Sequence, residues 1–106
     1  MGHGDWRVGM EFRRFKASIN HDAPPEGIGG ALQALWHQAK GDWHEAHRLA
    51  QAQDDETGAW VHAYLHRVEG NNDNAGHWYR RAGKPPSSAR LNDEWEEIVS
   101  ALLRQA

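Results

Sequence analysis

Cysteine is absent from this chain of 106 residues, which excludes disulfide bonds, thiolate metal ligands and thiolate nucleophiles. The chain also lacks an apolar run of about 20 residues, the length that a membrane-spanning helix needs. No apolar segment of signal-peptide length follows Met1. These absences lead us to expect a cytoplasmic protein without a membrane partner.

Aliphatic side chains are scarce, and the mean hydropathy is -0.89. Six tryptophans offset this scarcity, because one buried aromatic residue removes about 150–250 Å² of surface from water. A chain of this length usually forms one domain. We therefore expect a single domain whose core contains few residues and many rings.

The chain has no excess of positive charge, since its formal net charge is -3 with the histidines neutral. The basic residues in the segment 80–90 are followed directly by acidic residues in the segment 93–97. Such runs are typical of solvated helix surfaces. The charge balance therefore argues against a nucleic-acid partner. Protonation of the eight histidines would make the formal charge positive.

The first 25 residues are expected to form an N-terminal extension and a linker. The spacing of Phe12 and Phe15 indicates a short amphipathic helix within this extension. Two consecutive prolines near its end would stop that helix. Met10 is an alternative to Met1 as the natural start of the protein.

Apolar residues recur at intervals of three and four in the rest of the chain, as in amphipathic helices. Gly41 and Gly70 separate two pairs of such segments. Asp-x-x-Glu capping boxes are expected at Asp42 and Asp93. The predicted elements are a first hairpin at 28–53, a second hairpin at 57–83 and a capping helix at 93–105.

The two predicted hairpins share a sequence pattern. A shift of 29 residues places Gly41 on Gly70 and His37 on His66, and it pairs apolar residues with apolar residues elsewhere. A repeated helical hairpin cannot bury its apolar face alone, so its copies stack on each other. We predict an all-α fold of two stacked antiparallel helical hairpins, closed by the C-terminal capping helix.

Two phrases resemble known helical repeats. The turn G-D-W-x-E-A at Gly41–Ala46 resembles the tetratricopeptide hairpin, and N-A-x-x-W-Y-R-R-A-G at Asn74–Gly83 resembles the second helix of Sel-type repeats. The chain also resembles a group of small uncharacterised bacterial proteins that carry V-H-A-Y-L-H-R-x-E-G. The resemblance implies a TPR-like fold and a protein or peptide partner that binds along the first helices of the hairpins.

A binding surface is therefore expected on the first helices of the two hairpins. In the segment 57–69 the predicted inner stripe runs from Trp60 to Val68, so His62 and His66 should lie on the outer, polar side. The residues expected to line the binding surface are Gln33, His37, His62, His66 and Arg67.

The alternative is a metal site. His62 and His66 are one helical turn apart, and Glu69 shares their face. The repeat would bring His37 to the same surface. These ligand types suit Zn²⁺ or Ni²⁺. His44 and His47 also share a helix face, but Glu45 is the sole acid beside them, so they are the less favoured pair.

No sequence pattern dictates a reaction. The chain has no Gly-rich phosphate loop and no nucleophile elbow. We therefore expect a non-enzymatic module that binds a protein or peptide and needs no cofactor, as a monomer or a homodimer. The alternative function is metal or small-ligand binding by His37, His62 and His66, with weak hydrolytic chemistry as a further option, for which His66 and Glu69 would form the acid–base pair.

Overall fold

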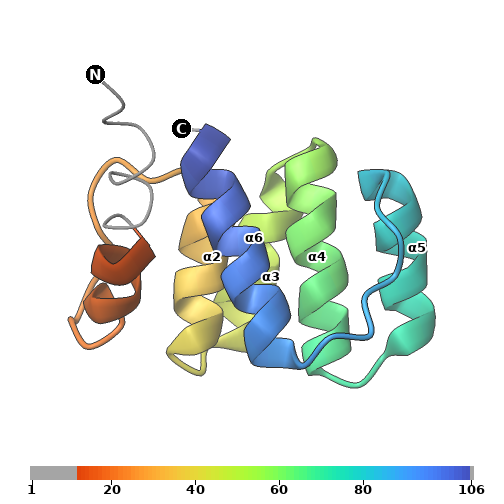
Figure 1. The fold of residues 1–106 in the computed structure, drawn as a ribbon, viewed down its shortest axis with the longest axis horizontal. Helices are drawn as coiled ribbons and strands as arrows, with labels where there is room; N and C mark the ends of the chain where they lie inside the picture. Colours follow the sequence, from red (N-terminus) through yellow and green to blue (C-terminus); the bar gives the residue numbers. More distant parts are fainter. Residues whose placement is uncertain (1–11, 106) are drawn as a thin grey trace.

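A computed structural model describes residues 12–105 of the chain. Within this part the protein is all-α and contains no strand, which confirms the predicted fold class. A helical segment at 12–18 precedes five longer helices (Figure 1). The longer helices are α2 (Gly30–Ala39), α3 (Trp43–Ala52), α4 (Glu56–Val68), α5 (Asn72–Ala82) and α6 (Leu91–Gln105).

Two helical hairpins form the body of the protein, as predicted: α2 packs against α3, and α4 packs against α5. The hairpins turn in the same way. Gly41 and Gly70 adopt positive φ angles of 91° and 85°, a conformation that glycine reaches without steric cost. In each turn the next residue donates its backbone N–H to a histidine carbonyl, from Asp42 to His37 at 2.9 Å and from Asn71 to His66 at 2.8 Å.

The helix caps match the sequence patterns in part. Asp42 accepts a hydrogen bond from the backbone N–H of Glu45 at 3.1 Å, as its capping box predicts. The Glu45 carboxylate does not complete that box, because it binds Arg48 instead. The box expected at Asp93 is wrong: α6 begins at Leu91, so Asp93 already lies inside its first turn.

Helix α6 lies across α2 and α4, on the face formed by the first helices of the two hairpins (Figure 1). Trp95 of α6 donates its indole N–H to the carbonyl of Leu35 at 3.1 Å. Glu94 is buried and receives hydrogen bonds from Arg67 and from the Tyr79 hydroxyl. The apolar stripe of α6 is buried against this face, as its spacing predicts, and comprises Trp95, Ile98, Val99, Leu102 and Leu103.

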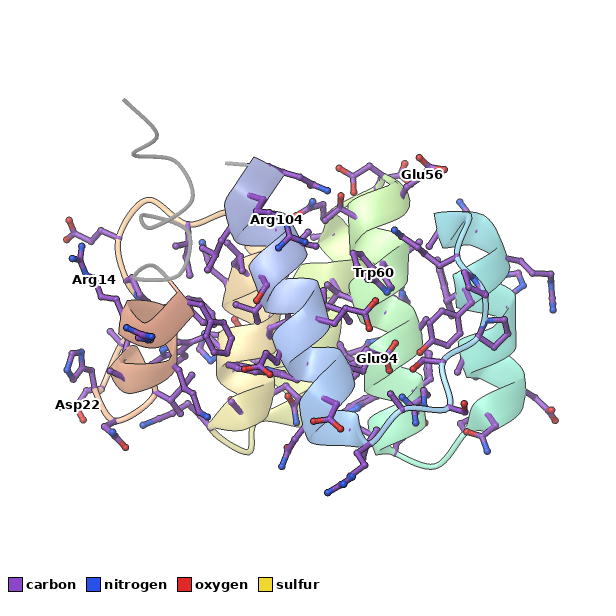
Figure 2. The ribbon with its side chains drawn as sticks, viewed as in Figure 1. Arg14, Asp22, Glu56, Trp60, Glu94 and Arg104 are labelled. Atoms are coloured by element: carbon purple, nitrogen blue, oxygen red, sulfur yellow. The ribbon has the colours of Figure 1, made fainter. Side chains whose placement is uncertain are left out.

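The helical segment at 12–18 lies on the outer side of α2 (Figures 1 and 2), and it contacts α6 through the ring of Phe15. Phe15 is buried, and its ring centroid lies 5.9 Å from that of Trp95. The indole N–H of Trp36 donates to the hydroxyl of Ser18 at 3.2 Å. Lys40 fixes the following turn by donating to the carbonyl of Ile19 at 2.8 Å.

Among the described residues, no helix has the length and apolar character that crossing a bilayer requires.

Candidate metal centre: a histidine cluster between the hairpins

Three histidines meet at the interface between the two hairpins. His47 comes from α3, and His62 and His66 come from α4. One ring nitrogen of each lies within 4.8 Å of the others, and this is the only such group of potential metal ligands in the part of the chain that the structure describes. His62 and His66 are buried, with 3% and 7% of their surface exposed, whereas His47 is half-buried.

The position of α4 explains why its histidines are buried. This helix packs against α2, α3, α5 and α6, and every residue from Gly58 to His66 is buried. The expectation that His62 and His66 lie on an exposed outer side is therefore wrong. A helix with neighbours on all sides has no polar face, so its imidazoles must find partners inside the protein.

Tryptophan rings hold the cluster from two sides. Trp78 stacks on His62 with ring centroids 3.8 Å apart and an interplanar angle of 16°. Trp43 stacks on His47 at 4.8 Å and 17°. The indole N–H of Trp43 donates to the carbonyl of Leu65 at 2.8 Å, which fixes this ring against α4. The imidazoles are therefore confined to a narrow range of orientations.

The two nearest ligand atoms are the Nε2 atoms of His47 and His62, which lie 2.9 Å apart. One of these nitrogens carries the proton of this hydrogen bond and the other accepts it. A tetrahedral zinc ion with Zn–N bonds of about 2.0–2.1 Å separates its nitrogen ligands by about 3.3 Å. The two rings would therefore need to part by only a few tenths of an ångström.

The electrostatics of the cluster favour neutral imidazoles. Burial, followed by repulsion from His47 and His66, lowers the pKa of His62 from 6.5 to about 4. Burial and the neighbouring His66 also lower the pKa of His47, against an opposing effect from Glu69. At neutral pH both rings keep a lone pair, which is the form that binds metal ions.

His66 has one nitrogen without a hydrogen-bond partner. Its Nδ1 is buried and neither donates nor accepts a hydrogen bond among the described residues. The nearest carboxylate oxygen, Oε1 of Glu69, lies 3.5 Å away. Buried polar atoms in folded proteins are normally satisfied. The Nδ1 atom of His66 is an exception to this rule, and it lies beside the Glu69 carboxylate. Metal sites regularly contain a histidine–carboxylate pair of this kind.

The structure brings together some of the residues expected at a metal site, and places others apart. His62, His66 and Glu69 are adjacent, but His37 is not part of the three-nitrogen group. The His37 ring packs against Trp36 on α2 instead, with centroids 5.1 Å apart. The third member is His47, the residue that sequence reasoning favoured less.

One signal in the sequence could have identified His47. Trp43 lies three residues before Ala46, on the apolar face of an amphipathic helix, and His47 follows Trp43 by four residues, so both lie on one side of the same helix. The remaining residues of the expected binding surface lie elsewhere. Gln33 donates to the carbonyl of Ile28 at 2.9 Å, and Arg67 is engaged by Glu94 beneath α6.

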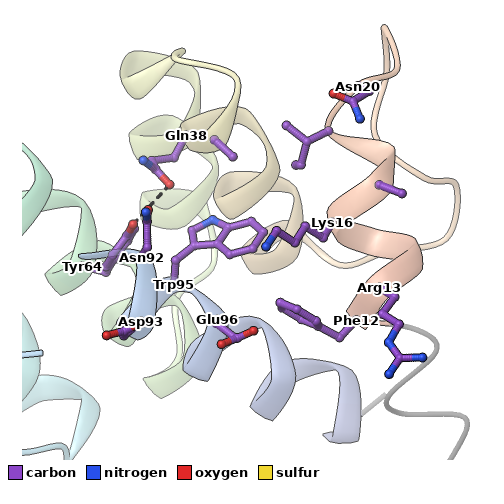
Figure 3. A pocket seen from close by; sticks show the side chains of 13 residues that line it. Phe12, Arg13, Lys16, Asn20, Gln38, Tyr64, Asn92, Asp93, Trp95 and Glu96 are labelled. Carbon is purple, nitrogen blue, oxygen red and sulfur yellow. Dashed lines mark hydrogen bonds between the residues drawn. The ribbon is translucent and has the colours of Figure 1, made fainter. Parts of the chain in front are cut away.

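Two cavities open near these elements. The smaller, of about 380 Å³, adjoins the histidine cluster, because His62 and Trp78 line it, together with the three consecutive acidic residues 54–56. The larger, of about 900 Å³, lies between residues 12–20 and the start of α6 (Figure 3). Its charged residues are Arg13, Lys16, Asp93 and Glu96.

Comparison of the chain with family models, with curated proteins and with solved structures found no match in any of the three.

Proposed function

We propose that the protein binds a divalent transition-metal ion, with Zn²⁺ as the first candidate, through His47, His62 and His66. The observation that carries this proposal is the convergence of three ring nitrogens within 4.8 Å of one another. Three imidazoles are a ligand set found in zinc sites. They also suit Ni²⁺ and Cu²⁺, so the identity of the ion is a question for experiment.

A purely structural role for the cluster is a poorer explanation of its hydrogen bonding. Three imidazoles share one mutual hydrogen bond, between His47 and His62. His66 Nδ1 has no partner. Polar groups buried only for packing usually find partners, because an unsatisfied one costs about 1–3 kcal/mol. A cation bound to one nitrogen of each ring would fix where each ring carries its proton, and at His66 the Glu69 carboxylate, 3.5 Å from Nδ1, is placed to accept it.

The site would connect the two hairpins. His47 belongs to the first hairpin, and His62 and His66 belong to the second. An ion held by all three would therefore fix α3 against α4. Because the ion requires this folded arrangement, its binding free energy would add to the free energy of unfolding.

Metal titration of untagged, metal-free protein tests the proposal. We expect one ion of Zn²⁺ per chain by calorimetry and by elemental analysis. His47→Ala, His62→Ala and His66→Ala should each abolish tight binding. His44→Ala is the matched control, because His44 is exposed on the same helix as His47. Absence of binding by the wild type, or equal losses in the control, would refute the metal site.

Protein or peptide binding is the second candidate function. The expected surface on α2 and α4 is occupied by α6. The larger cavity, which forms a groove between residues 12–20 and the start of α6 (Figure 3), is therefore the better location. Arg13 and Lys16 line one wall of this groove, and Asp93 and Glu96 line another. Opposite charges on facing walls suit an extended peptide that carries both signs of charge.

Charge reversal in the groove tests this second candidate. Lys16→Glu should weaken binding of a mixed-charge peptide selected against the wild-type protein. Arg104→Glu makes the same charge change at an exposed position outside the groove, and it should leave the affinity unchanged. Equal affinities for both variants would exclude the groove.

A further inference from the structure

Glu69 has a position that the three-histidine site alone does not explain. It is the C-cap residue directly after α4, and its φ and ψ angles of -82° and -2° continue the helical turn of His66. Its carboxylate lies 3.5 Å from His66 Nδ1, and within 4.0 Å it meets no other cationic group among the described residues. The side chain is 34% exposed, so it retains freedom to rotate.

The histidine side of this contact is more constrained. His66 is more than nine-tenths buried, and its Nδ1 is the one buried side-chain nitrogen or oxygen without a hydrogen-bond partner in the described part of the chain. The ring is held between His62, with centroids 4.9 Å apart, and the edge of Trp43, at 6.0 Å. The carboxylate is therefore the mobile partner, and a small rotation would bring it into hydrogen-bond distance.

We propose that Glu69 is a positioning residue for the metal centre, which accepts a hydrogen bond from His66 Nδ1–H and so leaves Nε2 of His66 to bind the ion. This inference rests on the proposed metal-binding function. A neutral imidazole carries one N–H, and an acceptor at one nitrogen places the lone pair on the other. Glu69 thereby selects the form of His66 that can bind.

The carboxylate would act on the ion in two further ways. A hydrogen bond from the ring to a carboxylate increases the electron density at the metal-bound nitrogen, which strengthens the bond to the ion. The negative charge also lies close to the cluster and attracts a cation. Glu69 itself is outside the group of converging ligand atoms, so the geometry assigns it to His66 and not to the ion.

Two substitutions separate these effects. Glu69→Ala removes both the acceptor and the charge, and loss of a carboxylate that holds a ligating histidine weakens metal affinity about 10- to 100-fold. Glu69→Gln keeps an acceptor oxygen but removes the charge, so its affinity should fall between those of Glu69→Ala and the wild type. Glu45→Gln is the control, because it removes the same charge from an α3 side chain that is 32% exposed and whose carboxylate binds Arg48.

Nitrogen NMR of ¹⁵N-histidine-labelled, zinc-loaded protein provides the readout that a merely structural role would not change. In the wild type we expect His66 to carry its proton on Nδ1 and to bind zinc through Nε2. In Glu69→Gln the same form should persist, whereas Glu69→Ala should show a mixture or a loss of the bound signal.

The outcomes distinguish this inference from the function on which it rests. If the wild type binds no metal, the proposed function fails. If the wild type binds one ion but Glu69→Ala binds as tightly, the positioning role of Glu69 is overturned while the metal site remains. Zinc bound through Nδ1 of His66 in the wild type would overturn it in the same way.

Discussion

The Nε2 atoms of His47 and His62 lie 2.9 Å apart and share one hydrogen bond across the interface of the two hairpins. The same two nitrogens are ligands of the proposed metal ion. Proton and metal therefore compete for one position in the protein, because both nitrogens must present lone pairs to the ion.

Acid should destabilise the metal-free protein. The pKa of His62 is lowered to about 4 in the folded protein from an ordinary value of 6.5. The unfolded chain therefore binds a proton at pH values where the folded protein does not. The stability that the neutral His62 side chain contributes is fully present above pH 6.5. As the pH falls towards 4, the free energy of unfolding decreases by on the order of 1–2 kcal/mol.

Urea unfolding at pH 7.5, 5.5 and 4.5 measures this effect. His62→Gln should reduce the dependence on pH, because the side chain no longer titrates. His21→Gln serves as the control, since His21 is exposed on the turn after residue 18. Identical pH profiles for the wild type and His62→Gln would show that His62 is not responsible.

Zinc should raise the melting temperature. An ion that binds only the folded protein adds about 2.7 kcal/mol at a free concentration roughly 100-fold above Kd. For a domain of this size that corresponds to an increase of about 10–20 °C. Calorimetry with and without a chelator measures the change, and His47→Ala should show none of it. An equal increase in His47→Ala would place the ion elsewhere.

Gly58→Ala should destabilise the protein strongly. A Cβ atom at Gly58 would lie 1.9 Å from the carbonyl oxygen of Gln53, so the turn between α3 and α4 would have to move. We expect a loss of at least about 2 kcal/mol. Gly76→Ala is the matched helical control, because its Cβ would meet nothing closer than 3.8 Å. That change should be neutral or stabilise by about 0.5–1 kcal/mol. Chemical denaturation compares the two, and similar effects would contradict the steric argument.

Glu94→Ala should weaken the packing of α6 on the hairpins and lower the free energy of unfolding. Glu94 is 1% exposed and receives hydrogen bonds from Arg67 on α4 and Tyr79 on α5. Its removal takes the carboxylate from the Arg67 guanidinium, which keeps its hydrogen bond to the Ala89 carbonyl, and leaves the Tyr79 hydroxyl without its acceptor. We expect a loss of about 3 kcal/mol. Glu97→Ala, at an exposed position three residues later, should change the free energy of unfolding by less than about 0.5 kcal/mol. Equal effects from both would argue against the buried network.

The sequence predicts most of the fold because local signals place the helices. Gly41 and Gly70 adopt the left-handed turns expected of them, and the stripe from Trp95 to Leu103 is buried as its spacing requires. The position of α6 over α2 and α4 is not a local property. An amphipathic stripe shows that a helix packs on one face, but it does not identify the helices that cover that face. The repeat, the family resemblance and the domain boundaries stay predictions.

The candidate site can be predicted only in part, again because local signals do not place one helix relative to another. The spacing of His62 and His66 identifies a pair of ligands on one helix, since four residues make one turn. Their burial depends on α3 and α5, which cover α4 from both sides. His47 reaches the cluster from another helix, and the relative rotation of two helices cannot be obtained from the periodicity of either. His37 was expected there by analogy between hairpins, and such analogy does not determine which helix faces the interface.

The donors of the proposed site are divided unequally between the hairpins, one on α3 and two on α4. Neither hairpin alone can coordinate an ion with three imidazoles, so the affinity would report how well the two are docked. A displacement of one hairpin relative to the other would weaken metal binding even with all three ligands intact. Conversely, metal binding would stabilise the relative position of the hairpins and with it the packing of α6, which contacts both.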